Sequence, residues 1–281
     1  MSKISTSDLA EYLAWLRTNY KPIRLNGSTE PLSQKSIRNV WVTFRSFFGW
    51  LHKEFKYPNP ALEIKAPKIQ QRPVEPFTKE EIEKMLKACG YTKESKTETR
   101  KKFVMRRPTA SRDQAIVLTL LDTGLRATEI CSLKIGDVDL KTGKVTVKHG
   151  VGGGAKGGKG RTVYLGKVTR KAVWRYLTSR EDGDDSDAPL FINVANRPFT
   201  KTSLRFLIKR LGARAGIKNA YPHKFRHTFA ITYLRSGGDI FTLQLLMGHS
   251  SLDMVRHYAK IAELDVEQSH RKASPVDNLH L

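Results

Sequence analysis

The chain has 281 residues, and its 50 lysines and arginines against 27 acidic residues give a net charge of +23 at neutral pH. Such an excess, spread along the chain rather than packed into one tail, favours nucleic acid as a partner over an acidic membrane surface. No apolar run reaches the roughly 20 residues that span a bilayer, no secretory signal is evident, and two cysteines make no disulfide framework, so we expect a cytoplasmic protein without a membrane span.

The first part of the chain is expected to form two helices. Apolar residues recur at helical spacing from Leu9 to Tyr20, and Ser7 is the predicted N-cap of this helix. A longer, strongly aromatic stripe runs from Ile37 to Leu51, in a helix that Ser33 opens. Exposed aromatic rings could stack on bases, but the helical period of this stripe favours packing in a core.

A proline-rich stretch separates these helices from the rest of the chain. Five prolines fall between residues 58 and 76. Proline at that density resists both helix and sheet. We therefore expect a small helical domain over residues 1–66, a linker over residues 67–76 and a larger domain over residues 77–281.

The larger domain is expected to be mostly helical. Periodic apolar residues, capping boxes at Thr78 and Ser111 and glycine stops predict the helices. They cover about residues 79–88, 111–123, 128–133, 168–179, 200–215, 224–236 and 239–247, with another after Ser251. Residues 144–148 and 161–165 alternate apolar and polar side chains, which predicts a short antiparallel hairpin around a glycine-rich turn. The predicted fold class is therefore mainly α with one small hairpin.

Cationic side chains and one tyrosine stand where several of these helices begin or end. In chain order they are Arg126, with Glu129 three residues later as a possible brace, His223, Arg226, His249 and Tyr258. Arginine suits a phosphate because its planar fork donates hydrogen bonds in pairs and keeps its proton near neutral pH. A tyrosine with an ordinary pKa of about 10 needs help to become a nucleophile. The set could hold a phosphodiester while a tyrosine oxygen attacks it.

In this order and spacing, the chain resembles the tyrosine recombinases, the family of phage integrases and Xer-type resolvases. The resemblance covers about residues 77–260 and includes Thr-Gly-Leu-Arg at 123–126 and Leu-Met-Gly-His at 246–249. It implies a site-specific recombinase that cuts and rejoins DNA through a 3′-phosphotyrosyl bond without ATP, metal or another cofactor. The implied partners are double-stranded DNA and three further copies of the chain, as a homo-tetramer on that DNA.

The resemblance also implies a role for each residue of the set. Tyr258 would be the nucleophile, and Arg126 and Arg226 would bind the scissile phosphate. His223 and His249 would assist proton transfer and hydrogen-bond the phosphate.

The family further places a lysine in the turn of a hairpin that follows the first arginine. Lys156 matches this position best, as the general acid for the leaving oxygen. The turn is longer and richer in glycine than the family pattern, so Lys159 stays as the alternative.

Two competing motifs fail on their context. Gly153–Lys159 fits the phosphate-binding pattern G-x-x-x-x-G-K, but Gly160 follows where Ser or Thr is required, and a strand follows where a helix is needed. His223 and His227 are four residues apart, as on a zinc helix, but no glutamate lies between them and no third ligand is apparent.

Two other functions remain open at this point. One is a type IB topoisomerase-like enzyme, which relaxes supercoils as a monomer with a similar residue set. The other is a basic DNA-binding or regulatory protein whose catalytic set is inert.

Overall fold

A computed structural model describes residues 4–24, 27–68, 75–92, 104–148, 160–248, 255–256, 258–259, 270 and 274–278. The chain divides into two compact units, residues 1–73 and 74–281. The division falls inside the proline-rich stretch. No helix in these described segments is both long and apolar enough to cross a membrane.

The first unit is a pair of packed helices, α1 (Thr6–Thr18) and α2 (Gln34–Phe55). Ser33 caps α2 as predicted. The prediction of Ser7 as the other cap is wrong, because Asp8 completes a capping box with Ser5 and α1 therefore starts earlier. The aromatic stripe is only partly core, since Phe48 is buried while Phe47 is 50% exposed.

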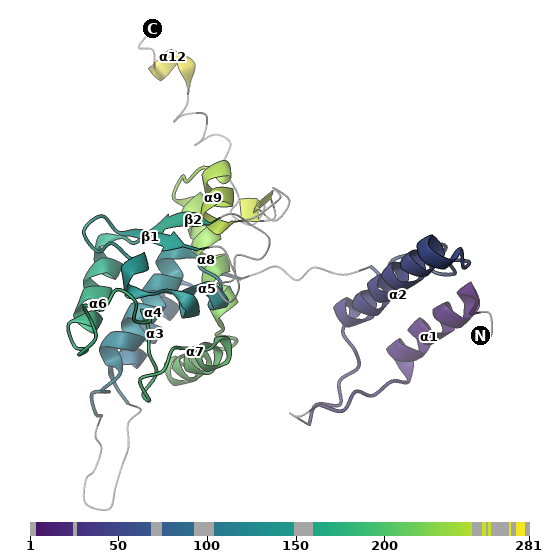
Figure 1. The fold of residues 1–281 in the computed structure, drawn as a ribbon, viewed down its shortest axis with the longest axis horizontal. Helices are drawn as coiled ribbons and strands as arrows, with labels where there is room; N and C mark the ends of the chain where they lie inside the picture. The colour runs from purple at the N-terminus through teal and green to yellow at the C-terminus, as the bar shows by residue number, and fades with distance from the viewer. Residues whose placement is uncertain are drawn as a thin grey trace, which may run out of the picture. The chain divides into compact units, whose positions relative to one another are not determined.

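The second unit is mostly helical around one small antiparallel sheet, which confirms the predicted fold class (Figure 1). Its elements are α3 (Lys79–Gly90), α4 (Ala110–Thr123), α5 (Ala127–Ser132), the 3-10 turn η1 (Ile135–Asp137), β1 (Lys144–Val147), β2 (Arg161–Tyr164), α6 (Lys167–Leu177), α7 (Lys201–Ala215), α8 (Pro222–Arg235), α9 (Ile240–Met247) and α12 (Pro275–Asn278). The two strands pair with Val145 opposite Val163, so their apolar side chains enter the core together.

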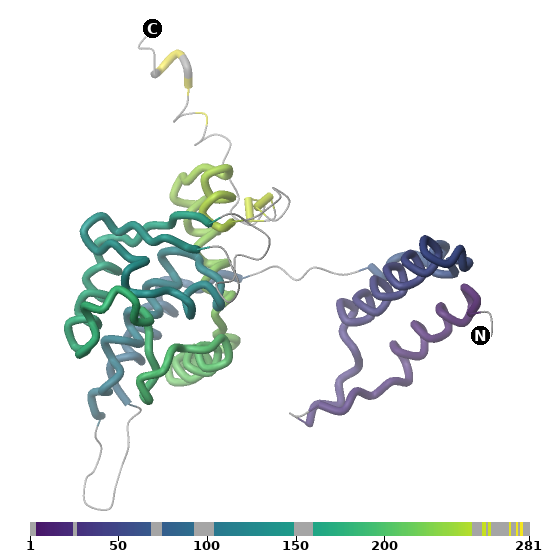
Figure 2. Tube along the Cα trace, viewed as in Figure 1, coloured from purple at the N-terminus to yellow at the C-terminus, as the bar shows by residue number. Residues whose placement is uncertain are grey.

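Helix α4 is the central element of this unit. It is buried along most of its length and packs against α3, α6 and α8. Helix α9 packs against α8 and β2, so segments far apart in the sequence meet beside the hairpin (Figure 2). The predicted capping box at Ser111 is wrong, because α4 begins at Ala110 after Thr109. Asp113, inside the predicted Ser111–Gln114 box, is fully buried and pairs with Arg107 and Arg112.

Two predicted glycine stops end α4 and α9, and both are confirmed. Gly124 and Gly248 each have φ of +59°, in the left-handed region that favours glycine. A Cβ atom at Gly124 would also lie 2.4 Å from Cδ1 of Phe229. These stops fix where the last carbonyl groups of both helices lie.

Candidate active site

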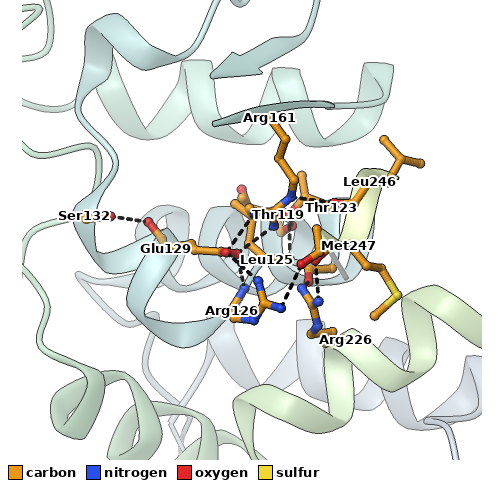
Figure 3. A network of polar contacts seen from close by, with 12 residues as sticks. Thr119, Thr123, Leu125, Arg126, Glu129, Ser132, Arg161, Arg226, Leu246 and Met247 are labelled. Carbon is orange, nitrogen blue, oxygen red and sulfur yellow. Dashed lines mark hydrogen bonds and ion pairs between the residues drawn. The ribbon is translucent and has the colours of Figure 1, made fainter. Parts of the chain in front are cut away.

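A buried carboxylate organises the site beside the hairpin (Figure 3). Glu129 in α5 is fully buried. Its Oε1 accepts hydrogen bonds from Nη1 of Arg126 at 3.0 Å and from Nη1 of Arg161 at 2.8 Å. Its Oε2 accepts from the backbone N–H of Arg126 at 2.7 Å and from Nη2 of Arg161 at 2.8 Å. One carboxylate therefore fixes both the backbone and the guanidinium group of Arg126.

Arg161 is a site residue that the sequence did not reveal. It opens β2, and its side chain is only 9% exposed. Besides its fork on Glu129, its Nε donates to the carbonyl oxygen of Leu246 at 2.7 Å. A basic residue after a glycine-rich turn looks like a solvated one, and both partners lie far away in the sequence. Arg161 thus joins the hairpin to α5 and to the end of α9.

Arg226 approaches the same place from α8. It is 1% exposed, and it donates to the carbonyl oxygen of Gly124 at 2.7 Å and to that of Met247 at 2.5 Å. Nη2 of Arg126 donates to the carbonyl oxygen of Gly248 at 3.2 Å. The ends of α4 and α9 therefore supply the carbonyl groups that hold both arginines (Figure 3).

The electrostatic environment of these arginines favours the binding of an anion. Burial, with a smaller contribution from the nearby charge of Arg126, lowers the pKa of Arg226 to about 9, while Glu129 opposes the shift. Burial alone would raise the pKa of Glu129, but the hydrogen bonds and charge of Arg161, with help from Arg126, leave it below its ordinary value. Three guanidinium groups thus share one carboxylate among the described residues of the site.

Tyr258 lies at the polar edge of a small apolar cluster. Its ring is 2% exposed and packs with Ile231, Leu234 and Met247. Its hydroxyl group lies 2.8 Å from Nδ1 of His227. Burial raises the pKa of Tyr258, and the charges of Arg226 and Arg126 act in the opposite direction. The side chain is therefore buried in the core, and its oxygen contacts His227 and feels the charge of both arginines.

Two histidines of α8 lie next to one another. The rings of His223 and His227 meet edge to face with centroids 4.4 Å apart. His227 also contacts the ring of Tyr258, with centroids 5.5 Å apart. From the sequence, His227 was considered only as a possible zinc ligand, and its contact with Tyr258 was not predicted. Among the described residues, no three histidine, cysteine, aspartate or glutamate side chains gather as metal ligands.

Of the predicted site residues, the structure brings Arg126, Glu129 and Arg226 together and places Tyr258 within reach of their charges. His223 lies on α8, where its ring contacts that of His227. Three predicted residues, Lys156, Lys159 and His249, lie outside the described segments.

Comparison with known proteins gives one consistent result. The profile of the phage integrase family matches residues 75–264. Tyrosine recombinase XerA of Thermococcus kodakarensis is 32% identical over 260 residues, which cover 92% of this chain and 80% of that protein. Tyrosine recombinase XerC of Bacillus pumilus is 31% identical over 255 residues, covering 87% and 76%.

Solved structures agree in fold. The crystal structure of XerA recombinase matches with a TM-score of 0.55 and 25% identity, covering 97% of this chain and 85% of that one. The XerH site-specific recombinase, bound to a palindromic difH substrate, matches with a TM-score of 0.69 and 22% identity, covering 99% and 74%.

Proposed function

This chain belongs to the phage integrase family of tyrosine recombinases and is a site-specific recombinase, and we propose that it works through a covalent bond between Tyr258 and a 3′-phosphate of DNA. The phenolic oxygen attacks the scissile phosphorus, and the 5′ oxygen leaves as a hydroxyl. The 5′ hydroxyl of a partner duplex then attacks the phosphotyrosine and restores a phosphodiester. The energy of the cleaved bond is kept in the protein–DNA link, so the cycle needs no ATP.

In this proposal, Arg126 and Arg226 hold the non-bridging oxygens of the phosphate. Their positive charge stabilises the transition state without a metal ion. His223 and His249 hydrogen-bond the same phosphate, and Lys156 protonates the leaving oxygen, with Lys159 as the alternative. Glu129 acts through Arg126, which it fixes in place.

One observation carries the assignment of the site. Arg126 at the start of α5 and Arg226 in α8 are a hundred residues apart in the chain, yet the charge of each acts on the hydroxyl of Tyr258. A phosphate held by both guanidinium groups would lie in the same region of positive charge as that hydroxyl. A tyrosine packed only for stability would not need this surrounding of positive charge.

The same proposal extends to the assembly. Double-stranded DNA is the substrate, which agrees with the net charge of +23 and with the difH substrate in the XerH structure. Residues 1–66 and 77–281 form two domains that close on the duplex, joined by residues 67–76. Two duplexes must be cut in concert, so four copies assemble on DNA, in the cytoplasm.

The alternatives considered from the sequence are not favoured. The similar proteins are site-specific recombinases, which speaks against an enzyme that only relaxes supercoils. An inert DNA-binding protein would have no need to place the hydroxyl group of Tyr258 under the charge of two buried or half-buried arginines.

The test is a covalent adduct. Duplexes that the protein binds are first enriched from a random library, and a nicked version of the enriched duplex then traps the protein–DNA link. The unaltered protein should form the adduct, and Tyr258→Phe should bind the duplex but form none. Tyr233→Phe is the matched control, because Tyr233 packs in the same apolar cluster, and it should still form the adduct. An adduct with Tyr258→Phe would show that another residue is the nucleophile.

A further inference from the structure

The hydroxyl group of Tyr258 has one neighbour to which the family resemblance gives no role. Nδ1 of His227 lies 2.8 Å from it, at hydrogen-bonding distance. If Tyr258 is the nucleophile, this oxygen is the atom that must lose a proton. We infer that His227 is the base that accepts the phenolic proton of Tyr258 during attack, an inference that rests on the proposed function.

The position of His227 follows from how α8 is held. Pro222 starts the helix, and His223 and His227 lie four residues apart, on one face. Arg226 precedes His227 and is bound to the ends of two other helices. This contact fixes the rotation of α8 and therefore the direction in which the His227 ring points.

The chemistry of the contact suits general-base catalysis. A neutral imidazole with its proton on Nε2 has a free lone pair on Nδ1, which can accept the phenolic hydrogen. An ordinary imidazole has a pKa of about 6.5 and a phenol one of about 10. The proton therefore passes to His227 only as the oxygen begins to bond to phosphorus, which is what a general base does.

The charged groups around this contact favour transfer of the proton from Tyr258 to His227. Arg226 and Arg126 act on the phenolic oxygen of Tyr258 and oppose the effect of burial on its pKa. They stabilise the negative charge that develops on this oxygen as the proton leaves. The ring of His223 contacts the far side of His227 at a centroid distance of 4.4 Å. His223 could then serve the phosphate while His227 serves the tyrosine.

Each bond and each proton has a defined place in the cleavage step. The proton of Tyr258 moves to Nδ1 of His227, the bond between the phenolic oxygen and phosphorus forms, and the bond from phosphorus to the 5′ oxygen breaks. The leaving oxygen takes a proton from the general acid, for which Lys156 is proposed. In the return step, the deprotonated general acid takes the proton of the attacking 5′ hydroxyl, and His227 gives its proton back to the departing phenolic oxygen.

Two reactions distinguish a role of His227 as a general base from a purely structural role. The first is adduct formation on the enriched nicked duplex, which requires the proton to leave Tyr258. The second joins a 5′-hydroxyl strand to a strand that ends in a 3′-(4-nitrophenyl) phosphate, and it is measured in the Tyr258→Phe background. Nitrophenolate leaves without being protonated, so this second reaction needs the arginines and the general folding of the site but no base or acid at the tyrosine.

The informative variant is His227→Asn, because an asparagine amide can occupy the place of Nδ1 and keep a hydrogen bond but cannot take up a proton. It should slow adduct formation by about 100-fold or more, within the usual range for general acid–base groups, and should slow nitrophenyl ligation by less than about threefold. His223→Asn is the matched control on the same face of α8. It should slow both reactions by a similar factor, since it would remove a phosphate contact.

Several outcomes would overturn the inference. Equal slowing of both reactions by His227→Asn, repeated with His227→Gln, would reduce the residue to a structural role. A selective loss of adduct formation in His223→Asn instead would assign the base to that histidine. Failure of the unaltered protein to form any adduct would refute the proposed function, whereas a normal adduct rate in His227→Asn would refute this inference alone.

Discussion

The substitution Glu129→Gln should destabilise the second unit by about 3 kcal/mol. Glu129 is fully buried and accepts four hydrogen bonds, two from Arg126 and two from Arg161. Glutamine has nearly the same shape, but its amide nitrogen would face guanidinium donors, and its neutral charge would leave Arg161 unpaired. Breaking a buried ion pair costs about 3–5 kcal/mol. We use the lower end because the Arg126 side chain is 31% exposed.

The measurement is the unfolding of the full chain by calorimetry and by urea. For a unit of this size, about 3 kcal/mol corresponds to a fall in Tm of roughly 6–12 °C. Glu83→Gln is the control, because the Glu83 side chain is 65% exposed and 4.0 Å from Lys79. It should change stability by less than about 0.5 kcal/mol. Equal effects of the two substitutions would refute the view that Glu129 organises the site.

A double-mutant cycle tests the mechanism of this loss. Arg161→Met removes the charge that Glu129→Gln leaves unpaired, so the double variant should be more stable than the sum of the single effects predicts, by about 1–3 kcal/mol. Additive effects would contradict the pairing. The folded-state pKa of Glu129 is below its ordinary value, so its contribution is present at neutral pH and is lost as pH falls through the folded-state value. The difference between Glu129→Gln and the unaltered protein should therefore shrink in acid.

Two further predictions concern pH and the glycine stops. With subsaturating DNA, the single-turnover rate of adduct formation should fall as pH rises past about 9, where Arg226 loses its proton. With saturating DNA, this fall should occur at higher pH, because a bound phosphate favours the charged arginine. A fall at the same pH under both conditions would contradict the prediction. Gly124→Ala should lower stability by about 2 kcal/mol or more through left-handed strain and a clash with Phe229, whereas Gly49→Ala, with open space in α2, should be neutral or stabilising by thermal unfolding.

The fold was largely predictable because its signals are local. The stops at Gly124 and Gly248 could be identified since only glycine readily adopts the left-handed conformation that ends a helix. The two strands were identified from alternation because one face of each is buried. The capping box predicted from Ser111 to Gln114 was wrong, because α4 already begins at Ala110 and Ser111 lies inside the helix, and a local pattern cannot show where tertiary packing starts a helix.

Only those parts of the candidate site that are marked by the order and spacing of residues along the chain could be predicted. Order and spacing led to the prediction of Arg126, Arg226 and Tyr258 as site residues. Arg161 and His227 were missed because their significance lies in their partners. Arg161 binds a carboxylate 32 positions away and a carbonyl group 85 positions away, and His227 contacts a hydroxyl group 31 positions away. Such pairings become visible only when the tertiary structure is known.

The charge balance of the site supports the proposal that it binds a phosphodiester. Among the described residues, Arg126, Arg161 and Arg226 share the single carboxylate of Glu129. The carbonyl groups that end α4 and α9 offer only the partial negative charge of a helix terminus, and the lowered pKa of Arg226 shows that this does not offset burial. A bound anion would favour the charged form of Arg226. In the proposed reaction, the phosphodiester brings one negative charge to Arg126 and Arg226 while Tyr258 attacks, so the substrate would stabilise the charged arginines that in turn stabilise its transition state.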